Sequence, residues 1–355
     1  MANMLRKFKA ALRLIRIHSL MVTALTPLLG ACATFAVFKE DLLLSNKLPI
    51  LVNLFFVGVM VHIFGEILND YIDYNIDKTN IELSEKPLVS GDISKKGALL
   101  GIILSFIIVV IIFAYSQFNI LSIMIFIIAS ITGILYQLIS KKWVHSAVFL
   151  SLWAFFIILF GGVYAGKYDN LLDVPALVYI ISILGFFHLW MNTAILGHLK
   201  DIKNDAEYGV VTFPMLLGVK VDEKGEIPKL IIPMRFRYLV LIIQFINLII
   251  AFIPIMFYKK FYDGNINLLM LSLFLILISI MIIMSQIRIM WHRLFERNKL
   301  MRMMAVREIG TYFLAIVLIS PLIGWVMVLF FILTPLVWFI LVNLFFTGNP
   351  MQPPI

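Results

Sequence analysis

The chain has 355 residues, of which 62% are hydrophobic and 14% are charged, and its mean hydropathy is +1.02. Soluble globular domains are nearer to about 50% apolar and about 25% charged, so the composition excludes an ordinary soluble protein. The net charge of +9 calls for no nucleic-acid partner, because Lys and Arg concentrate in the loops between apolar segments. We therefore expect an integral membrane protein.

The first 18 residues are basic, with apolar side chains at helical spacing among the basic ones: Leu5, Phe8, Leu12 and Ile15. This pattern is typical of an amphipathic helix that lies in the membrane interface. It does not resemble a cleavable signal, which has a continuous apolar core.

Apolar segments of about 20 residues, long enough to cross about 30 Å of hydrocarbon as a helix, follow along the chain. They do not alternate polar and apolar residues as barrel strands do. The predicted fold is all-α: a polytopic membrane bundle of about nine transmembrane helices with a central cavity open to the cytoplasmic side. The predicted spans are 19–39, 49–70, 97–115, 119–138, 144–164, 174–197, 235–257, 266–287 and 310–333.

The last apolar tract continues to Phe346. Pro321 and Pro335 could kink it, or the tract from Leu333 to Phe346 could be a short re-entrant or interfacial piece. The sequence leaves both possibilities open.

Of the 29 Lys and Arg residues, 24 fall on one side of the predicted membrane. By the positive-inside rule, the N-terminus and the predicted active site are cytoplasmic in the cell membrane. We predict an interfacial helix over 1–18, one transmembrane domain over 19–346 and a tail over 347–355. Acidic motifs that close spans two and six predict two related four-helix halves, followed by a final span.

The first acidic motif lies at the end of span two and contains Asn69, Asp70, Asp73 and Asp77. In a helix, Asn69, Asp73 and Asp77 share one face at i, i+4 and i+8. Carboxylates at a helix C-terminus need a compensating cation, because the helix dipole is negative there. Hard oxygen ligands favour Mg²⁺. The alternative is a solvated acidic loop.

The second acidic motif closes span six, with Asp201 and Asp205 again at i and i+4. Such pairs are common on surfaces, but this one lies on the same membrane face as the first motif. Facing carboxylate clusters can hold two or three Mg²⁺ ions around a diphosphate. The predicted metal ligands are Asn69, Asp70, Asp73, Asp77, Asp201 and Asp205.

Lysines stand beside both motifs: Lys86 after the first, Lys200 and Lys203 within the second, and Lys141 and Lys142 after span four. These cations could bind the phosphate oxygens. For each lysine alone, a purely topological role is at least as good an explanation.

The first motif, followed by the segment from Lys86 to Ser94, resembles the UbiA family of intramembrane prenyltransferases. Asp201 to Asp205, followed by Tyr208 to Gly218, looks like the second aspartate motif of that family. Lys86 stands where the family often has Arg. His198 stands where many members have another aspartate, and either touches a phosphate or packs as a polar residue.

The resemblance implies Mg²⁺-dependent transfer of a prenyl group from an isoprenyl diphosphate to a lipophilic acceptor within membrane lipid. An aromatic, quinone-precursor ring is the main expectation, and geranylgeranylglyceryl phosphate in ether-lipid synthesis is the alternative. The implied catalytic residues are Asp70, Asp73, Asp77, Asp201 and Asp205. The implied substrate-binding residues are Asn69, Lys86, Lys141, Lys142, His198, Lys200 and Lys203.

A cation transporter is the rival from another class, but transporters usually place their acids near mid-span, whereas these lie at helix ends beside lysines. Two further ionisable residues, His62 and Glu66, lie inside span two, where such groups are costly and usually functional. They either line the acceptor pocket or pair with each other. The candidate aromatic residues for a carbocation cavity are Trp153, Phe156, Tyr164, Phe187 and Trp190.

Overall fold

The computed structural model describes residues 2–38, 47–79, 83–207, 209–224, 228–257, 262 and 268–350. Tyr208 of the second motif's continuation lies outside these residues. So do Lys39, Lys259 and Lys260 of the charge count, and the end of the predicted tail.

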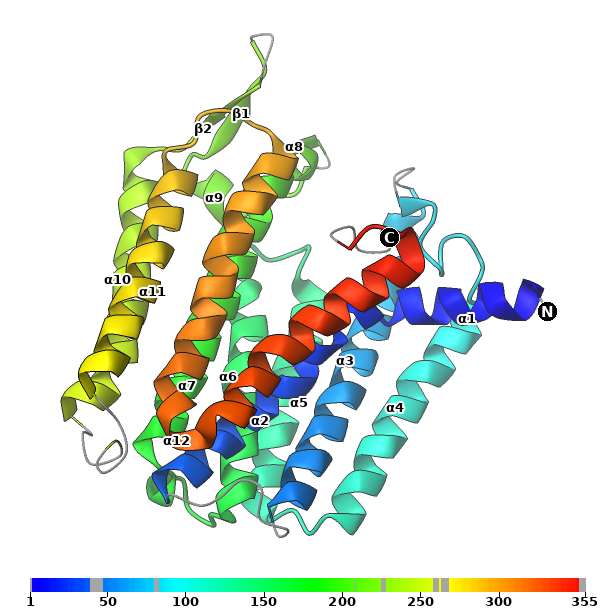
Figure 1. Ribbon diagram of the computed structural model, residues 1–355. Helices are drawn as coiled ribbons and strands as arrows, with labels where there is room; N and C mark the ends of the chain where they lie inside the picture. The colour runs from blue at the N-terminus through cyan, green and yellow to red at the C-terminus, as the bar shows by residue number, and fades with distance from the viewer. Residues whose placement is uncertain are drawn as a thin grey trace.

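The described chain is a bundle of long helices, with one short β-hairpin at the end that carries the second motif (Figure 1). The first half comprises α1 (Ala2–Leu14), α2 (Leu20–Val37), α3 (Leu48–Asp77), α4 (Lys95–Tyr115), α5 (Ile120–Ile139) and α6 (Ala147–Gly166). The second half comprises α7 (Ala176–Trp190), α8 (His198–Glu207), α9 (Phe213–Leu216), β1 (Lys220–Asp222), β2 (Lys229–Ile231), α10 (Met234–Phe257), α11 (Leu268–Met290) and α12 (Arg297–Thr347). Short 3₁₀ turns, η1 (Ile17–Ser19) and η3 (Leu171–Asp173), precede α2 and α7, and a π-helix, η4 (Met191–Gly197), joins α7 to α8.

Ten helical segments among the described residues are long and apolar enough to cross a membrane, one more than the sequence predicts. The additional one is Val326–Thr347, the C-terminal tract whose form the sequence left open. The break in α12 falls at Gly324, with φ 76° and ψ 157°, and not at Pro321 or Pro335. Glycine adopts this positive φ without a Cβ clash, so the chain can turn back there (Figure 1).

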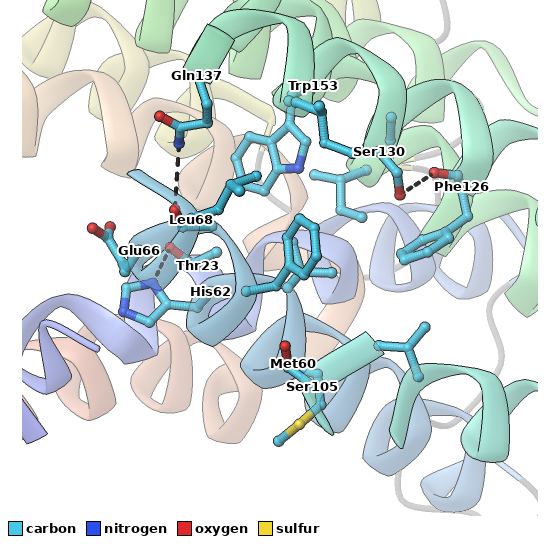
Figure 2. A pocket seen from close by; sticks show the side chains of 18 of the residues that line it. Thr23, Met60, His62, Glu66, Leu68, Ser105, Phe126, Ser130, Gln137 and Trp153 are labelled. Carbon is cyan, nitrogen blue, oxygen red and sulfur yellow. Dashed lines mark hydrogen bonds between the residues drawn. The ribbon is translucent and has the colours of Figure 1, made fainter. Parts of the chain in front are cut away.

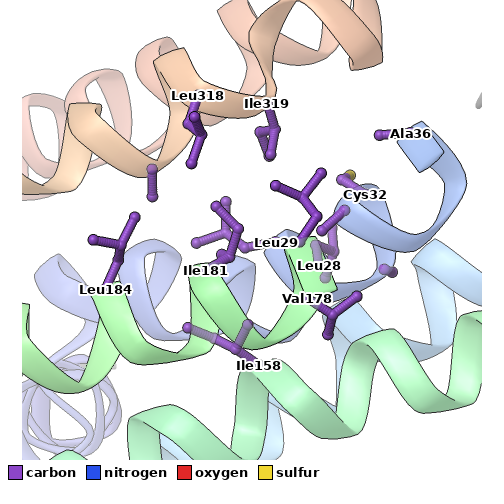
Figure 3. Packing of buried hydrophobic residues seen from close by; sticks show 14 of the residues in the cluster. Leu28, Leu29, Cys32, Ala36, Ile158, Val178, Ile181, Leu184, Leu318 and Ile319 are labelled. Carbon is purple, nitrogen blue, oxygen red and sulfur yellow. The ribbon is translucent and has the colours of Figure 1, made fainter. Parts of the chain in front are cut away.

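The core of the bundle is built around α2, whose small residues let neighbouring helices approach closely. A Cβ at Gly30 would lie 1.8 Å from the carbonyl oxygen of Ile158 on α6, and a Cβ at Gly161 would lie 1.8 Å from that of Pro27. Such small-residue contacts are typical of helices that associate in membranes. Figure 3 shows apolar side chains of α2, α6, α7 and α12 meeting around this contact, including Cys32.

The ends of α3 and α8 lie at the same end of the bundle, as the sequence predicts (Figure 1). Because α3 continues without interruption to Asp77, the whole first motif is helical and its i, i+4 spacing holds. The N-terminal helix α1 is joined to this end by Arg6 and Arg13, which both pair with Asp92. The interfacial position of α1 and the two-halves repeat stay predictions.

Candidate active site

The first motif presents two buried carboxylates that share one lysine. The side chains of Asp70 and Asp77 are only 5% and 4% exposed. Lys86 Nζ donates to Asp70 Oδ1 at 3.0 Å and to Asp77 Oδ2 at 2.7 Å. Burying a charge is costly unless it is paired, so this shared ammonium makes the burial of both aspartates possible.

A second lysine, from the loop after α5, joins the same cluster. Lys141 Nζ lies 2.9 Å from Asp73 Oδ2 and 3.8 Å from Asp77 Oδ1. The Asn69 amide donates to Gln137 Oε1 at 2.6 Å and so connects α3 to α5. The structure therefore brings together Asn69, all three aspartates of the first motif, and two of the predicted lysines.

Arg16 also belongs to this cluster, although the sequence predicted for it only a role in membrane orientation. Arg16 Nη1 lies 2.8 Å from Glu66 Oε2, and its Nη2 donates to Asp70 Oδ1 at 3.2 Å. Arg16 has φ 43°, a left-handed conformation that non-glycine residues rarely adopt. Such outliers collect at functional sites, and this one turns the guanidinium toward the acidic face of α3.

The protonation of these cations follows from their carboxylate partners. Partial burial by itself lowers the pKa of Lys86, but the charges and hydrogen bonds of Asp70 and Asp77 outweigh burial and raise it. The pKa of Arg16 is raised in the same way, with Glu66 and Asp70 outweighing burial. Both groups are therefore cationic at neutral pH.

The second motif is more exposed, with Asp201 and Asp205 side chains 30% and 24% exposed. Asp201 Oδ2 lies 2.5 Å from Lys200 Nζ, and its Oδ1 lies 2.9 Å from Arg297 Nη2 on α12. Asp205 Oδ2 lies 3.4 Å from His198 Nδ1. His198, which was predicted to bind substrate, therefore lies beside an aspartate of the second motif.

Two predicted lysines lie apart from the aspartates. Lys203 pairs with Glu223 at 2.9 Å, beyond the motif. Lys142 is exposed, and its side chain forms no ion pair within the described ranges. No hydrogen bond or ion pair between described residues joins one motif to the other, and no group of three His, Cys, Asp or Glu residues there is arranged to hold a metal ion. Lysines lie between the carboxylates instead.

An apolar cavity of about 330 Å³ lies mainly among α3, α4, α5 and α6. It adjoins the first motif through Glu66 and Gln137, whose partners are Arg16 and Asn69. Figure 2 shows His62, Glu66 and Gln137 on one side of the view, with Trp153 near Gln137 and Phe126 on the opposite side. Binding pockets for small molecules occupy about 300–1,000 Å³ and are mostly apolar with a few polar groups. The cavity therefore has the size and lining of a site for a hydrophobic chain.

The two intramembrane residues of α3 both line this cavity, but they do not pair with each other. His62 Nε2 lies 2.9 Å from the Ile15 carbonyl oxygen, and its Nδ1 lies 3.1 Å from Thr23 Oγ1. Glu66 pairs with Arg16 instead. Of the five aromatic residues proposed from the sequence, Trp153 lines the cavity, and Phe126, Phe106 and Phe64 line it as well.

Comparison with known proteins identifies the family to which these features belong. The model of the UbiA prenyltransferase family matches residues 24–224, a range that includes both acidic motifs. The chain belongs to the UbiA prenyltransferase family. Membership in this family favours a prenyltransferase over the cation transporter that was the rival hypothesis from the sequence.

Similar proteins of the UbiA group include digeranylgeranylglyceryl phosphate synthases. The protein of that name from Methanobrevibacter smithii is 28% identical over 203 residues, which are 52% of this chain and 64% of that protein. The one from Methanoculleus marisnigri is 30% identical over 214 residues, which are 59% of this chain and 69% of that protein. The chain thus spans just under two thirds of the first of these relatives.

Solved structures of UbiA proteins have the same fold. A digeranylgeranylglyceryl phosphate synthase structure superposes with a TM-score of 0.63 at 19% identity, covering 89% of this chain and 99% of that one. A UbiA homologue from Archaeoglobus fulgidus, bound to GPP and Mg²⁺, superposes with a TM-score of 0.52 at 17% identity, covering 85% of this chain and 99% of that one.

The sequence did not predict that two arginines, Arg16 and Arg297, form ion pairs with the acidic motifs. Each lies at a helix end, where arginine is also expected for topology, so composition alone does not distinguish the two roles. For Arg16, the sequence offered one signal, a weak similarity of the segment from Arg16 to Ser19 to the entry segment of the UbiA family. For Arg297, which follows Asp201 by 96 residues, the sequence offered none.

Proposed function

We propose that this protein transfers a prenyl group from an isoprenyl diphosphate to the hydroxyl group of a prenylglyceryl phosphate, in a reaction that requires Mg²⁺. One observation carries the proposal: a cluster of buried aspartates and cations adjoins an apolar cavity at Glu66 and Gln137. The named relatives support the glyceryl phosphate acceptor, which was the alternative, over the aromatic ring.

The cluster beside the cavity suits the diphosphate. Lys86, Lys141 and Arg16 already lie among the carboxylates, and each can turn its donors to phosphate oxygens. The oxygen ligands of the two motifs are of the hard type that Mg²⁺ prefers, and the chemistry of this donor set therefore fits the metal. The proposed ligands are Asn69, Asp70, Asp73, Asp77, Asp201 and Asp205.

When bound, Mg²⁺ supplies positive charge to the departing diphosphate. The lysines and Arg16 add to this charge as the allylic C–O bond breaks and the diphosphate leaves with the electron pair. Phe126 and Trp153 line the cavity, and aromatic rings stabilise a cation such as the prenyl group held against their faces. The apolar lining excludes water that would otherwise capture this cation.

The acceptor hydroxyl oxygen then forms the new C–O bond and loses its proton. Glu66 is the single carboxylate among the described residues that line the cavity, one turn of α3 from Asp70. We assign Glu66 as the group that receives this proton. Its ion pair with Arg16, at 2.8 Å, holds the carboxylate in place beside the cavity.

The test uses purified protein in lipid nanodiscs with Mg²⁺ and labelled geranylgeranyl diphosphate. It offers geranylgeranylglyceryl phosphate and 4-hydroxybenzoate in parallel, with product masses as the readout. The expected product is a glyceryl phosphate that carries a second prenyl group, and a metal chelator abolishes it. If only the aromatic acid is prenylated, the acceptor is an aromatic ring and not a glyceryl phosphate. If neither acceptor is prenylated, the proposal is contradicted.

A further inference from the structure

The span that carries the second motif is not a uniform α-helix. α7 ends at Trp190, Met191–Gly197 is a π-helix, and α8 begins at His198. π-helices are rare, contain i→i+5 turns and occur frequently at functional sites. Because an α-helix has 3.6 residues per turn, one extra residue corresponds to a rotation of about 100°. The π-helix therefore decides which face of α8 carries Asp201 and Asp205 toward the bundle.

A fully buried arginine on α12 binds this π-helix. Arg307 is 0% exposed. Its Nη1 donates to Asn192 Oδ1 at 2.5 Å, and its Nη2 donates to Gln244 Oε1 at 3.0 Å. Asn192 is the second residue of the π-helix, and Gln244 lies on α10. One planar guanidinium thus connects three helices, and a lysine lacks the forked donors needed for the same contacts.

A second contact joins the same helices one turn away. His188 Nδ1 lies 2.7 Å from Thr311 Oγ1, and Asn192 Nδ2 lies 3.3 Å from His188 Nε2. The Thr311 hydroxyl donates to the Glu308 carbonyl oxygen at 3.0 Å. One arrangement of protons satisfies all these contacts: Asn192 donates to Nε2, and Nδ1–H donates to Thr311. The two contacts fix α7 against α12 where the π-helix begins.

α12 also contacts the second motif beyond the π-helix. Arg297 Nη2 lies 2.9 Å from Asp201 Oδ1, and Arg297 Nε donates to the same oxygen at 3.0 Å. The contacts of α12 therefore lie on both sides of the π-helix. If the π-helix became an α-helix, the rotation would break the contacts on one of the two sides.

We propose that Arg307 is a positioning residue. By binding Asn192 and Gln244 it keeps Met191–Gly197 in its π conformation, and it thereby sets the rotation of α8 that directs Asp201 and Asp205 to the diphosphate. The role of these aspartates rests on the proposed function. Without Arg307, the segment relaxes to an α-helix, and α8 turns by about 100°.

A labelling experiment reads this rotation without any need for activity. Cys32 is the only cysteine in the chain, so a Cys32→Ala background with Ile202→Cys carries one thiol on α8. Ile202 is 1% exposed, and the new thiol is therefore expected to react slowly with a water-soluble maleimide. Adding Arg307→Met is expected to raise the labelling rate at least about tenfold, because thiol reactivity follows exposure. The matched control is Arg302→Met, an exposed arginine on the same helix.

An activity experiment asks whether the rotation itself causes the defect. Arg307→Met is expected to raise the Mg²⁺ concentration for half-maximal rate by about tenfold, as is usual when residues that orient metal ligands are lost. Deleting Thr193 from this variant removes the extra residue of the π-helix. A regular α-helix then returns α8 to its original face, so Mg²⁺ dependence and thiol protection are both expected to recover. A merely structural role of Arg307 predicts no recovery from a second lesion.

The proposal is overturned if Ile202→Cys stays protected in Arg307→Met, or if deleting Thr193 restores neither property. If Arg307→Met does not fold, Arg307→Lys replaces it. That variant keeps the charge but replaces the planar fork, whose two nitrogens reach Asn192 and Gln244, by a single nitrogen. Wild-type values in it also overturn the proposal. If the wild-type protein transfers no prenyl group to any acceptor, the proposed function fails, while the labelling comparison still decides the role of Arg307.

Discussion

The two acidic motifs have similar sequences but different surroundings. In the first, Asp70 and Asp77 are almost completely buried and share the Lys86 ammonium. In the second, Asp201 and Asp205 are about one quarter to one third exposed. Their basic partners come from a neighbouring residue, from two turns earlier and from α12. The first motif is therefore buried by a lysine that is close in sequence, together with Lys141 and Arg16 from other segments. The more exposed second motif takes its distant partner from α12.

This difference has a physical cause. α3 is one uninterrupted helix, so the spacing of its aspartates is set by helix geometry alone. α8 follows a π-helix, and its rotation depends on what holds that π-helix. We expect the first motif to dominate catalysis and the second to be more adjustable.

The largest effect is expected for Asp77→Asn. Asp77 contacts both Lys86 and Lys141, so its loss removes a proposed metal ligand and the partner of two cations. The expected loss in kcat/KM for prenyl transfer exceeds about 100-fold, beyond what loss of a group behind a ligand usually costs. The control is Asp173→Asn, an exposed aspartate in η3. Near-normal activity in Asp77→Asn would contradict the proposed site.

A smaller loss is expected for Asp201→Asn. Its carboxylate is 30% exposed and paired with Lys200 and Arg297. We expect kcat/KM to fall by about 10-fold to 100-fold, mostly through a higher Mg²⁺ requirement. Steady-state rates over a Mg²⁺ titration give the measurement. If Asp201→Asn lowers kcat/KM as much as Asp77→Asn does, the expectation that the first motif dominates catalysis is wrong.

The cavity adjoins the first motif, so filling it tests where the prenyl chain lies. Ser105 lines the cavity, and Ser105→Phe would reduce the available space. The ratio of kcat/KM for geranylgeranyl diphosphate to that for dimethylallyl diphosphate is expected to fall about tenfold or more, since lost apolar contacts are worth at least that factor. Leu104→Phe is the matched control, because Leu104 is the adjacent residue and is 49% exposed. An unchanged ratio in Ser105→Phe would place the chain elsewhere.

The smallest effect concerns the shared ammonium of the first motif. Because the pKa of Lys86 is raised in the folded protein, its stabilising contribution is complete below the unfolded pKa and is lost as pH rises through the higher folded pKa. Lys86→Met is expected to lower Tm by about 2–4 °C at neutral pH. The difference in Tm between the wild type and Lys86→Met is expected to narrow above pH 10.5, the ordinary pKa of lysine. A gap that is constant with pH would show that Lys86 stabilises by packing alone.

Much of the fold follows from local patterns in the sequence. Eight of the nine predicted spans coincide with observed helices to within a few residues at most ends, because each apolar run of about 20 residues can satisfy its backbone only as a helix. The ninth begins earlier than predicted, at Arg297, and ends at Gly324. The tenth was left undecided because a single glycine, and neither proline, determines where the chain turns.

The candidate site was only partly predictable. Helical spacing placed Asn69, Asp73 and Asp77 on one face, and their proximity in sequence made Lys86 a natural partner. The pairing of Glu66 with Arg16, and not with His62, depends on how the segment before α2 packs against α3. No spacing rule predicts a contact of this kind.

The sequence by itself determined that the chain spans a membrane, that it carries two aspartate motifs at one end of its helices, and which family it resembles. These properties depend on composition and on short-range periodicity, which are the same in any packing of the helices. Only the tertiary structure decided that Lys86, Lys141 and Arg16 meet the first motif, that a cavity opens beside it, and that Arg307 binds the π-helix before the second. These contacts join residues as far as 115 positions apart, and only the packing of whole helices brings them together.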